Sequence, residues 1–150
     1  MDDEPNISAG PRILVVDDND EVRAVVVRNL LGAGYRVVQA ASSRAAIAIL
    51  QGQVPDLVIT DIFMPDGDGF EIINELRQCA LSVPIVVISG GGTVAGDYLH
   101  LARRLGATSV LSKPFRRHQL LDAVHLALRA ATPFLAYHWP ILLSSGSERA

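Results

Sequence analysis

Five short apolar runs recur along the chain, and a segment with helical spacing of apolar residues follows each one. The runs consist largely of Val, Ile and Leu and lie at residues 12–16, 35–40, 57–60, 84–89 and 108–112. Runs of this length, with turn residues on either side, are typical of strands buried on both faces of a sheet. Strands that alternate with amphipathic helices predict an α/β fold, in which helices cover both faces of a parallel sheet.

Capping residues and glycines mark where the first helices begin and end. Asn19 or Asp20 can cap the first helix, and Ser42 can cap the second. Gly34 and Gly106 follow apolar helical segments and can end them. The spacing predicts that the apolar face of the first helix contains Val22, Val25, Val26 and Leu30, and that of the second Ala45, Ile47, Ala48 and Leu50.

The 150 residues suffice for one domain, with a short segment at each end. We expect a polar lead-in over residues 1–11, the domain over 12–131 and an apolar, aromatic tail over 132–150. The tail holds the only tryptophan, Trp139. Two interpretations of it stay open: it folds back on its own domain or is incidental, or it docks on another protein, since aromatic residues often anchor interfaces.

Composition and charge narrow the class of protein. Hydrophobic residues make up 49% and charged residues 19%, which excludes a disordered chain. The net charge is −3 and no basic stripe is present, so nucleic acid is not an expected partner. The single cysteine, the acidic N-terminus and the lack of an apolar run of about 20 residues predict a soluble, cytoplasmic protein without a membrane span.

Polar residues stand where the buried strands end. Asp17 and Asp18 follow the first predicted strand, Asp61 follows the third, Ser89 ends the fourth and Lys113 follows the fifth. In open parallel sheets, ligands bind at the carboxyl ends of the strands. We therefore expect these five residues to converge on one site.

The residue types at this predicted site indicate a chemistry. Three carboxylates repel one another and need a cation, and oxygen ligands with room for water suit Mg²⁺. Lys113 adds a fixed positive charge and is the only lysine among 13 basic residues, and Ser89 offers a hydroxyl donor. Metal, ammonium and hydroxyl together could hold three phosphoryl oxygens. Asp61, at the end of the central strand, is then the natural nucleophile.

From about residue 11 to residue 131, the chain resembles bacterial response-regulator receiver domains, the CheY-like family. The matching motifs come in order at the predicted strand ends: Val15-Val16-Asp17-Asp18, Asp61 with Met64-Pro65-Asp66-Gly67-Asp68-Gly69, Ser89, and Lys113-Pro114-Phe115. The resemblance implies a flavodoxin-like, doubly wound sheet of five parallel strands in the order 2-1-3-4-5 with five helices. It also implies an apparently single-domain signalling switch of a two-component phosphorelay, not a turnover enzyme.

The resemblance assigns a role to each residue of the predicted site. Asp61 would accept a phosphoryl group from a sensor histidine kinase or a phosphotransfer protein. Mg²⁺ would be held by Asp17, Asp18, Asp61 and the main-chain carbonyl of Phe63. Ser89 and Lys113 would bind the phosphoryl oxygens. The Lys113–Pro114 peptide bond is commonly cis in the family.

Two positions depart from the family's usual residues. The family generally has an aromatic ring three residues before its lysine, where this chain has Val110, and a valine cannot swing inward as that ring does. Phe63 lies two residues after Asp61, where polar residues that orient water are common. We therefore expect a comparatively long-lived aspartyl phosphate.

The output of such a switch would pass to an unknown downstream protein or onward by phosphotransfer, because the tail is too short for a DNA-binding or catalytic domain. The resemblance places the interaction face around Tyr98, Arg103, Arg104, Val110, Arg116 and Arg117. That arginine cluster could equally be ordinary solvated surface, and the oligomeric state, including a homodimer, stays open. The Pro65–Gly69 loop is interpreted as structural, with glycines that allow unusual backbone angles.

Three other functions compete with this interpretation. A dinucleotide-binding enzyme would place glycines at the first turn, where Asp17 and Asp18 would instead repel a pyrophosphate. A phosphatase of the haloacid-dehalogenase type would place an acid at the position of Phe63. A receiver-like interaction module that works without phosphorylation would be expected to lack Asp61 or Lys113, and this alternative stays open in a milder form because of Val110.

Overall fold

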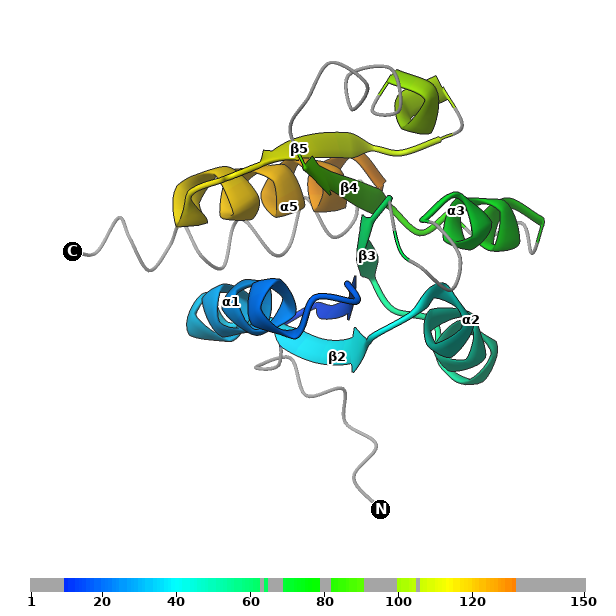
Figure 1. Cartoon of the computed structure of the whole chain (residues 1–150), viewed down its shortest axis with the longest axis horizontal. Coiled ribbons are helices and arrows are strands. Elements are labelled where there is room, and N and C mark those ends of the chain that lie inside the picture. Colours follow the sequence, from blue (N-terminus) through cyan, green and yellow to red (C-terminus); the bar gives the residue numbers. More distant parts are fainter. Residues whose placement is uncertain are drawn as a thin grey trace.

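One parallel sheet forms the centre of the molecule in the computed structural model, which describes residues 10–62, 64, 69–78, 82–90, 100–104 and 106–131. Its strands are β1 (Arg12–Val16), β2 (Arg36–Ala40), β3 (Leu57–Asp61), β4 (Ile85–Gly90) and β5 (Ser109–Lys113). They lie in the order β2-β1-β3-β4-β5, all parallel (Figure 1). The predicted strand order is confirmed.

Helices cover both faces of this sheet. They are α1 (Asp20–Gly32), α2 (Ser43–Gly52), α3 (Gly69–Gln78) and α5 (Arg117–Ala131), and residues 100–104 are also helical. Helices α1 and α5 lie on one side of the sheet, and α2 and α3 lie on the other (Figure 1). This alternation of strands and helices confirms the flavodoxin-like α/β fold.

The alternation of side chains along each strand creates two apolar cores. In β1, Ile13 and Val15 pack with α1 and α5, whereas Leu14 and Val16 pack with α2 and α3. All five residues of β3 are buried, because helices cover both of its faces. Continuous apolar runs were therefore the right signal for the central strands.

Local capping follows the sequence prediction. The side chain of Asn19 accepts hydrogen bonds from the backbone N–H groups of Glu21 and Val22, and Ser42 accepts one from Ala45. Asn19, rather than Asp20, is thus the cap of α1. Gly34 and Gly106 have positive φ angles of 92° and 119°, which explains a glycine at each of these turns.

The predicted helix faces were partly wrong. Val25 is 49% exposed, although the other residues predicted with it are buried or half-buried. In α2 the buried residues are Ser43, Ala46 and Leu50, whereas Ala45 and Ala48 are exposed. The cause is the alanine-rich sequence of this helix. Alanine occurs on both buried and exposed helix faces, so the pattern could not show that the buried face is rotated by one residue.

The described residues contain no helix that is both long and apolar enough to cross a bilayer. Helix α5 ends at Ala131, the last described residue. The tail and most of the lead-in lie outside the described residues, so the predicted division of the chain stays a prediction.

Candidate functional site

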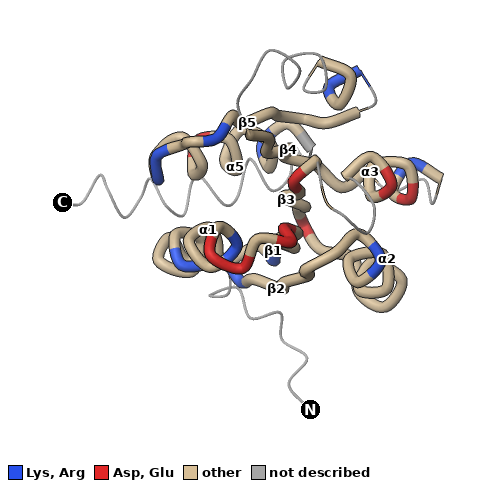
Figure 2. The backbone as a smooth tube through the Cα atoms, in the orientation of Figure 1, with Lys and Arg blue, Asp and Glu red and all other residues tan. Residues whose placement is uncertain are grey.

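Sheet register places two acidic strand ends side by side. Val16, the last residue of β1, pairs with Thr60 of β3, so the next residues along the two strands are Asp17 and Asp61. Asp18 continues the chain after Asp17, outside the strand. Figure 2 shows red, acidic stretches of the chain near β1, β3 and the start of α1. The expectation that these carboxylates lie close together at one edge of the sheet is confirmed.

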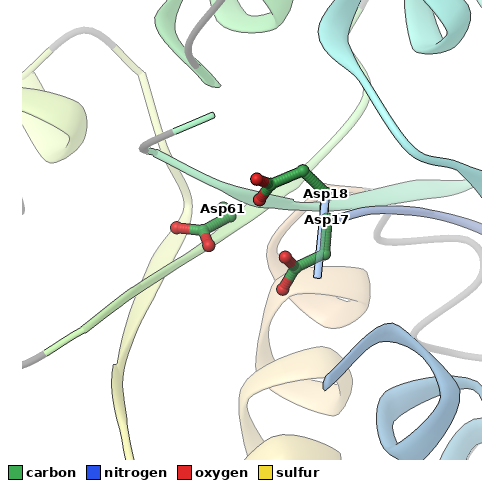
Figure 3. A group of neighbouring side chains, drawn as sticks. All are labelled: Asp17, Asp18 and Asp61. Atoms are coloured by element: carbon green, nitrogen blue, oxygen red, sulfur yellow. The ribbon is translucent and has the colours of Figure 1, made fainter. Parts of the chain in front are cut away.

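The three carboxylates converge on one small volume. Asp17, Asp18 and Asp61 each offer an oxygen, and these oxygens all lie within 4.8 Å of one another (Figure 3). Asp17 and Asp61 are buried and Asp18 is exposed. One exposed ligand beside two buried ones suits Mg²⁺, which binds oxygen ligands and retains water.

Lys113 completes the site from the far edge of the sheet. Its ammonium Nζ donates to Oδ2 of Asp61 at 2.9 Å and to Oδ2 of Asp17 at 3.4 Å. The following peptide bond, Lys113–Pro114, is cis, as the resemblance implies. Three carboxylates and one ammonium leave a formal charge of −2, which a divalent cation would balance.

Burial and pairing shift the protonation of two of these groups. Burial raises the pKa of Asp17, although the backbone N–H of Asn19 and the charge of Lys113 oppose that shift. Burial by itself would lower the pKa of Lys113, but its hydrogen bond to Asp61 and the charges of Asp61 and Asp17 outweigh that effect and raise it. Lys113 therefore stays protonated at neutral pH.

Helix α3 begins directly against the main chain of Asp61. The N–H of Gly69 donates to the carbonyl of Ile62 at 2.8 Å. A Cβ atom at Gly69 would overlap the main-chain carbonyl oxygen of Asp61. Gly69 is therefore needed for the close approach of α3 to the main chain of Asp61, and the expectation of unusual glycine backbone angles in the Pro65–Gly69 loop stays a prediction.

One residue at the site edge was missed by the sequence analysis. The guanidinium of Arg23 donates through Nη1 to the main-chain carbonyl of Asp17 at 2.7 Å and through Nη2 to Oδ1 of Asp20 at 2.6 Å. Its Nε donates to Oε1 of Gln39 at 3.1 Å. The available signal was an arginine near the start of the helix that follows Asp17 and Asp18, and in the sequence it looks like any other charged helix residue.

Ser89 lies at the end of β4 and is fully buried. Its hydroxyl donates to the main-chain carbonyl of Gly90 at 3.3 Å. The structure thus places the residue on the strand beside Asp61, with its hydroxyl on a backbone acceptor. Its predicted contact with phosphoryl oxygens stays a prediction.

The predicted switch and interface residues fall into three groups, one of which lies outside the described residues. Val110 is half-buried in β5, opposite Val87, and packs against the core cluster that includes α3. Arg103, Arg104, Arg116 and Arg117 are exposed. Phe63, Tyr98 and Trp139 lie outside the described residues.

A family model decides the class of this protein. The model of the response regulator receiver domain matches residues 13–125, which include all of the acidic site and Lys113. The chain belongs to the response-regulator receiver family. Receiver domains are signalling modules and not turnover enzymes, as the sequence predicted.

Individual relatives agree with this assignment. The chain is 37% identical over 122 residues to the response regulator MprA of Mycolicibacterium vanbaalenii, covering 81% of this chain and 52% of that protein. It is similar in structure to the chemotaxis protein CheY4 of Vibrio cholerae, with a TM-score of 0.71 and 32% identity, covering 79% of this chain and 99% of the other. For the receiver domain of NtrX from Brucella abortus, the TM-score is 0.73, the identity is 31% and the coverage is 78% and 98%. The chain spans about half the length of the curated relatives it matches.

Proposed function

We propose that this receiver domain is a phospho-accepting switch in a two-component phosphorelay, with Asp61 as the acceptor. The observation that carries the proposal is the ion pair of 2.9 Å between Asp61 and the only lysine of the chain, beside two further carboxylates. A carboxylate oxygen of Asp61 would attack the phosphorus of a phosphohistidine. A new O–P bond forms, the P–N bond breaks, and the imidazole leaves with the bonding electron pair.

Mg²⁺ fits the acidic residues of the site. Asp17, Asp18 and Asp61 would hold it, and we propose that the main-chain carbonyl of Phe63 joins them. When bound, the ion would offset negative charge on the phosphoryl group. Lys113 would bind a phosphoryl oxygen through Nζ, and Ser89 would donate its hydroxyl to another after exchanging its partner on Gly90.

A sensor histidine kinase or a phosphotransfer protein is the proposed donor. A groove of about 500 Å³ lies between α1 and the segment after β5, lined by Glu21, Val22, Val25, Lys113, Pro114 and Phe115. It is largely apolar, and one of its walls is the lysine that contacts Asp61. A partner seated there would bring its phosphohistidine beside the acceptor, which supports this choice of donor.

The output is proposed to pass by contact with a downstream protein, or by onward phosphotransfer. Val110 and the exposed arginines at 103 and 104 belong to the face proposed for this contact. Because position 110 is a valine, the signal would have to reach this face without the movement of an aromatic ring. It also keeps the phosphorylation-independent module as the second candidate function.

Intact-protein mass after incubation with acetyl phosphate and Mg²⁺ tests the proposal. We expect the wild type to gain one phosphoryl group and the Asp61→Asn variant to gain none. Asp122→Asn, which changes an exposed carboxylate on α5, is the matched control and should label like the wild type. A wild type that stays unlabelled at every Mg²⁺ concentration would favour the phosphorylation-independent module.

A further inference from the structure

The peptide between Asp17 and Asp18 is fixed by contacts around Asp17. The N–H of Asp17 donates to the carbonyl of Ala40 at 3.2 Å, and its Oδ1 accepts from the N–H of Asn19 at 2.9 Å. Its main-chain carbonyl accepts the bond of 2.7 Å from Arg23. Because a peptide unit is planar, holding this carbonyl also sets the orientation in which the chain enters Asp18.

Arg23 makes its contacts with three separate parts of the fold. Its guanidinium joins the end of β1 to the Asp20 side chain in the first turn of α1 and to Gln39 in β2. The Arg23 side chain is only 16% exposed, and its bond to the Asp17 carbonyl is partly buried, whereas its bonds to Asp20 and Gln39 lie at the surface. A lysine would keep the charge but could not reproduce this planar fork of donors.

We propose that Arg23 is a positioning residue, which orients the Asp17–Asp18 peptide so that both carboxylates can hold Mg²⁺. This inference rests on the proposed function, because it takes the acidic site to be a magnesium site. Hydrogen-bonding partners behind metal-binding carboxylates commonly change metal affinity by about 10- to 100-fold. Arg23 would act through the main-chain carbonyl of Asp17, because its hydrogen bond to Asp17 is to the backbone and not to the carboxylate.

A positioning role of Arg23 and a purely electrostatic effect of its charge predict opposite changes in Mg²⁺ affinity when Arg23 is replaced. Arg23 is a cation close to a cation site, so its charge alone opposes Mg²⁺ binding. Loss of that charge would tighten binding, and Arg23→Lys would leave binding unchanged. If Arg23 orients the peptide, both Arg23→Gln and Arg23→Lys weaken binding.

Isothermal titration calorimetry with MgCl₂ measures this on the full chain. We expect Kd to rise about tenfold or more in Arg23→Lys and Arg23→Gln, and by less in Gln39→Ala, which removes one partner of the guanidinium. Arg28→Lys and Arg28→Gln make the same changes at an exposed position on the same helix and should stay within about twofold of the wild type. Circular dichroism in EDTA identifies variants that are folded at the assay temperature.

Labelling by acetyl phosphate supplies the second readout. At low Mg²⁺ the Arg23→Lys variant should label slowly, and saturating Mg²⁺ should restore its rate towards that of the wild type. Folded Arg23 variants with unchanged or tighter Mg²⁺ binding would overturn the inference, while a labelled wild type would leave the proposed function standing. A wild type that binds no Mg²⁺ would overturn both.

Discussion

The buried carboxylate of Asp17 belongs to the acidic site but lowers the free energy of unfolding at neutral pH. Burial raises the pKa of Asp17, so the folded state binds a proton there more tightly than the unfolded chain does. The charged form therefore reduces stability at neutral pH. This penalty is absent below the ordinary value of 3.8 and grows as the pH rises through the raised folded-state value.

Asp17→Asn should stabilise the metal-free protein, because an amide can still accept from the N–H of Asn19 without carrying charge. In EDTA near about pH 7.5, we expect a midpoint of thermal unfolding about 3 °C higher, as a gain on the order of 1 kcal/mol produces in a domain of this length. The difference should shrink as the pH falls towards about 4. A variant that melts at or below the wild-type temperature at neutral pH would contradict this account.

Individual site residues differed in how far the sequence could predict them. Asp17, Asp61 and Lys113 could be placed together because the carboxyl ends of parallel strands meet at one edge of the sheet, and this does not depend on the conformation of the loops. The role of Arg23 could not be predicted in this way. A long side chain reaches several backbone and side-chain acceptors, and its choice among them depends on how α1 and β2 pack.

At the scale of elements, α3 begins in close contact with the main chain at the end of β3, at Gly69. We expect Gly69→Ala to destabilise the fold by about 1–3 kcal/mol, because a methyl group would overlap the carbonyl oxygen of Asp61 and neither backbone segment can yield cheaply. Because the displaced carbonyl belongs to Asp61, the proposed acceptor, labelling by acetyl phosphate should slow as well. Urea unfolding and intact mass measure the two effects.

Gly52→Ala is the matched control for this prediction. Gly52 ends α2, and a Cβ atom there meets nothing within 4 Å. Its stability should stay within about 1 kcal/mol of the wild type, with unchanged labelling. If the two alanine variants were equally stable, close approach would not be the reason for the glycine at position 69.

Elements were easier to predict than the faces they present. The strands were recognisable because apolar runs of β-branched residues have few alternatives in a buried sheet. The buried face of α2 was predicted wrongly, because its alanines differ little in their preference for burial or exposure. The rotation of this helix is set by packing against its neighbours, which the sequence pattern does not show. Ser43, fully buried at the start of that helix, donates to Oε2 of Glu71 in α3 at 3.3 Å, a long-range contact that periodicity cannot reveal.

For the whole molecule, the acidic site links strands from separate parts of the chain. Its carboxylates come from the two residues after β1 and from the last residue of β3, and Lys113 comes from β5 at the sheet edge. A ligand that binds only the assembled site stabilises the whole fold. We expect Mg²⁺ at ten times its Kd to add about 1.4 kcal/mol, and removal by EDTA to reverse this.

Thermal unfolding with MgCl₂, against NaCl at equal ionic strength, checks this expectation. The Asp18→Asn variant should respond less, because it lacks one of the three carboxylates while keeping the buried pair. Equal stabilisation of the wild type and this variant would indicate a general salt effect rather than a site.

The ion pair between Lys113 and Asp61 also affects the entropy that the proposed phosphorylation would cost. Ordering a lysine side chain costs about 1.5–2 kcal/mol of conformational entropy. In this protein the lysine is ordered during folding, because its ammonium already lies within hydrogen-bonding distance of the Asp61 carboxylate. In the proposed switch, phosphorylation of Asp61 would exchange one oxygen partner of the lysine for another, and no unpaired lysine side chain would have to be ordered at that step.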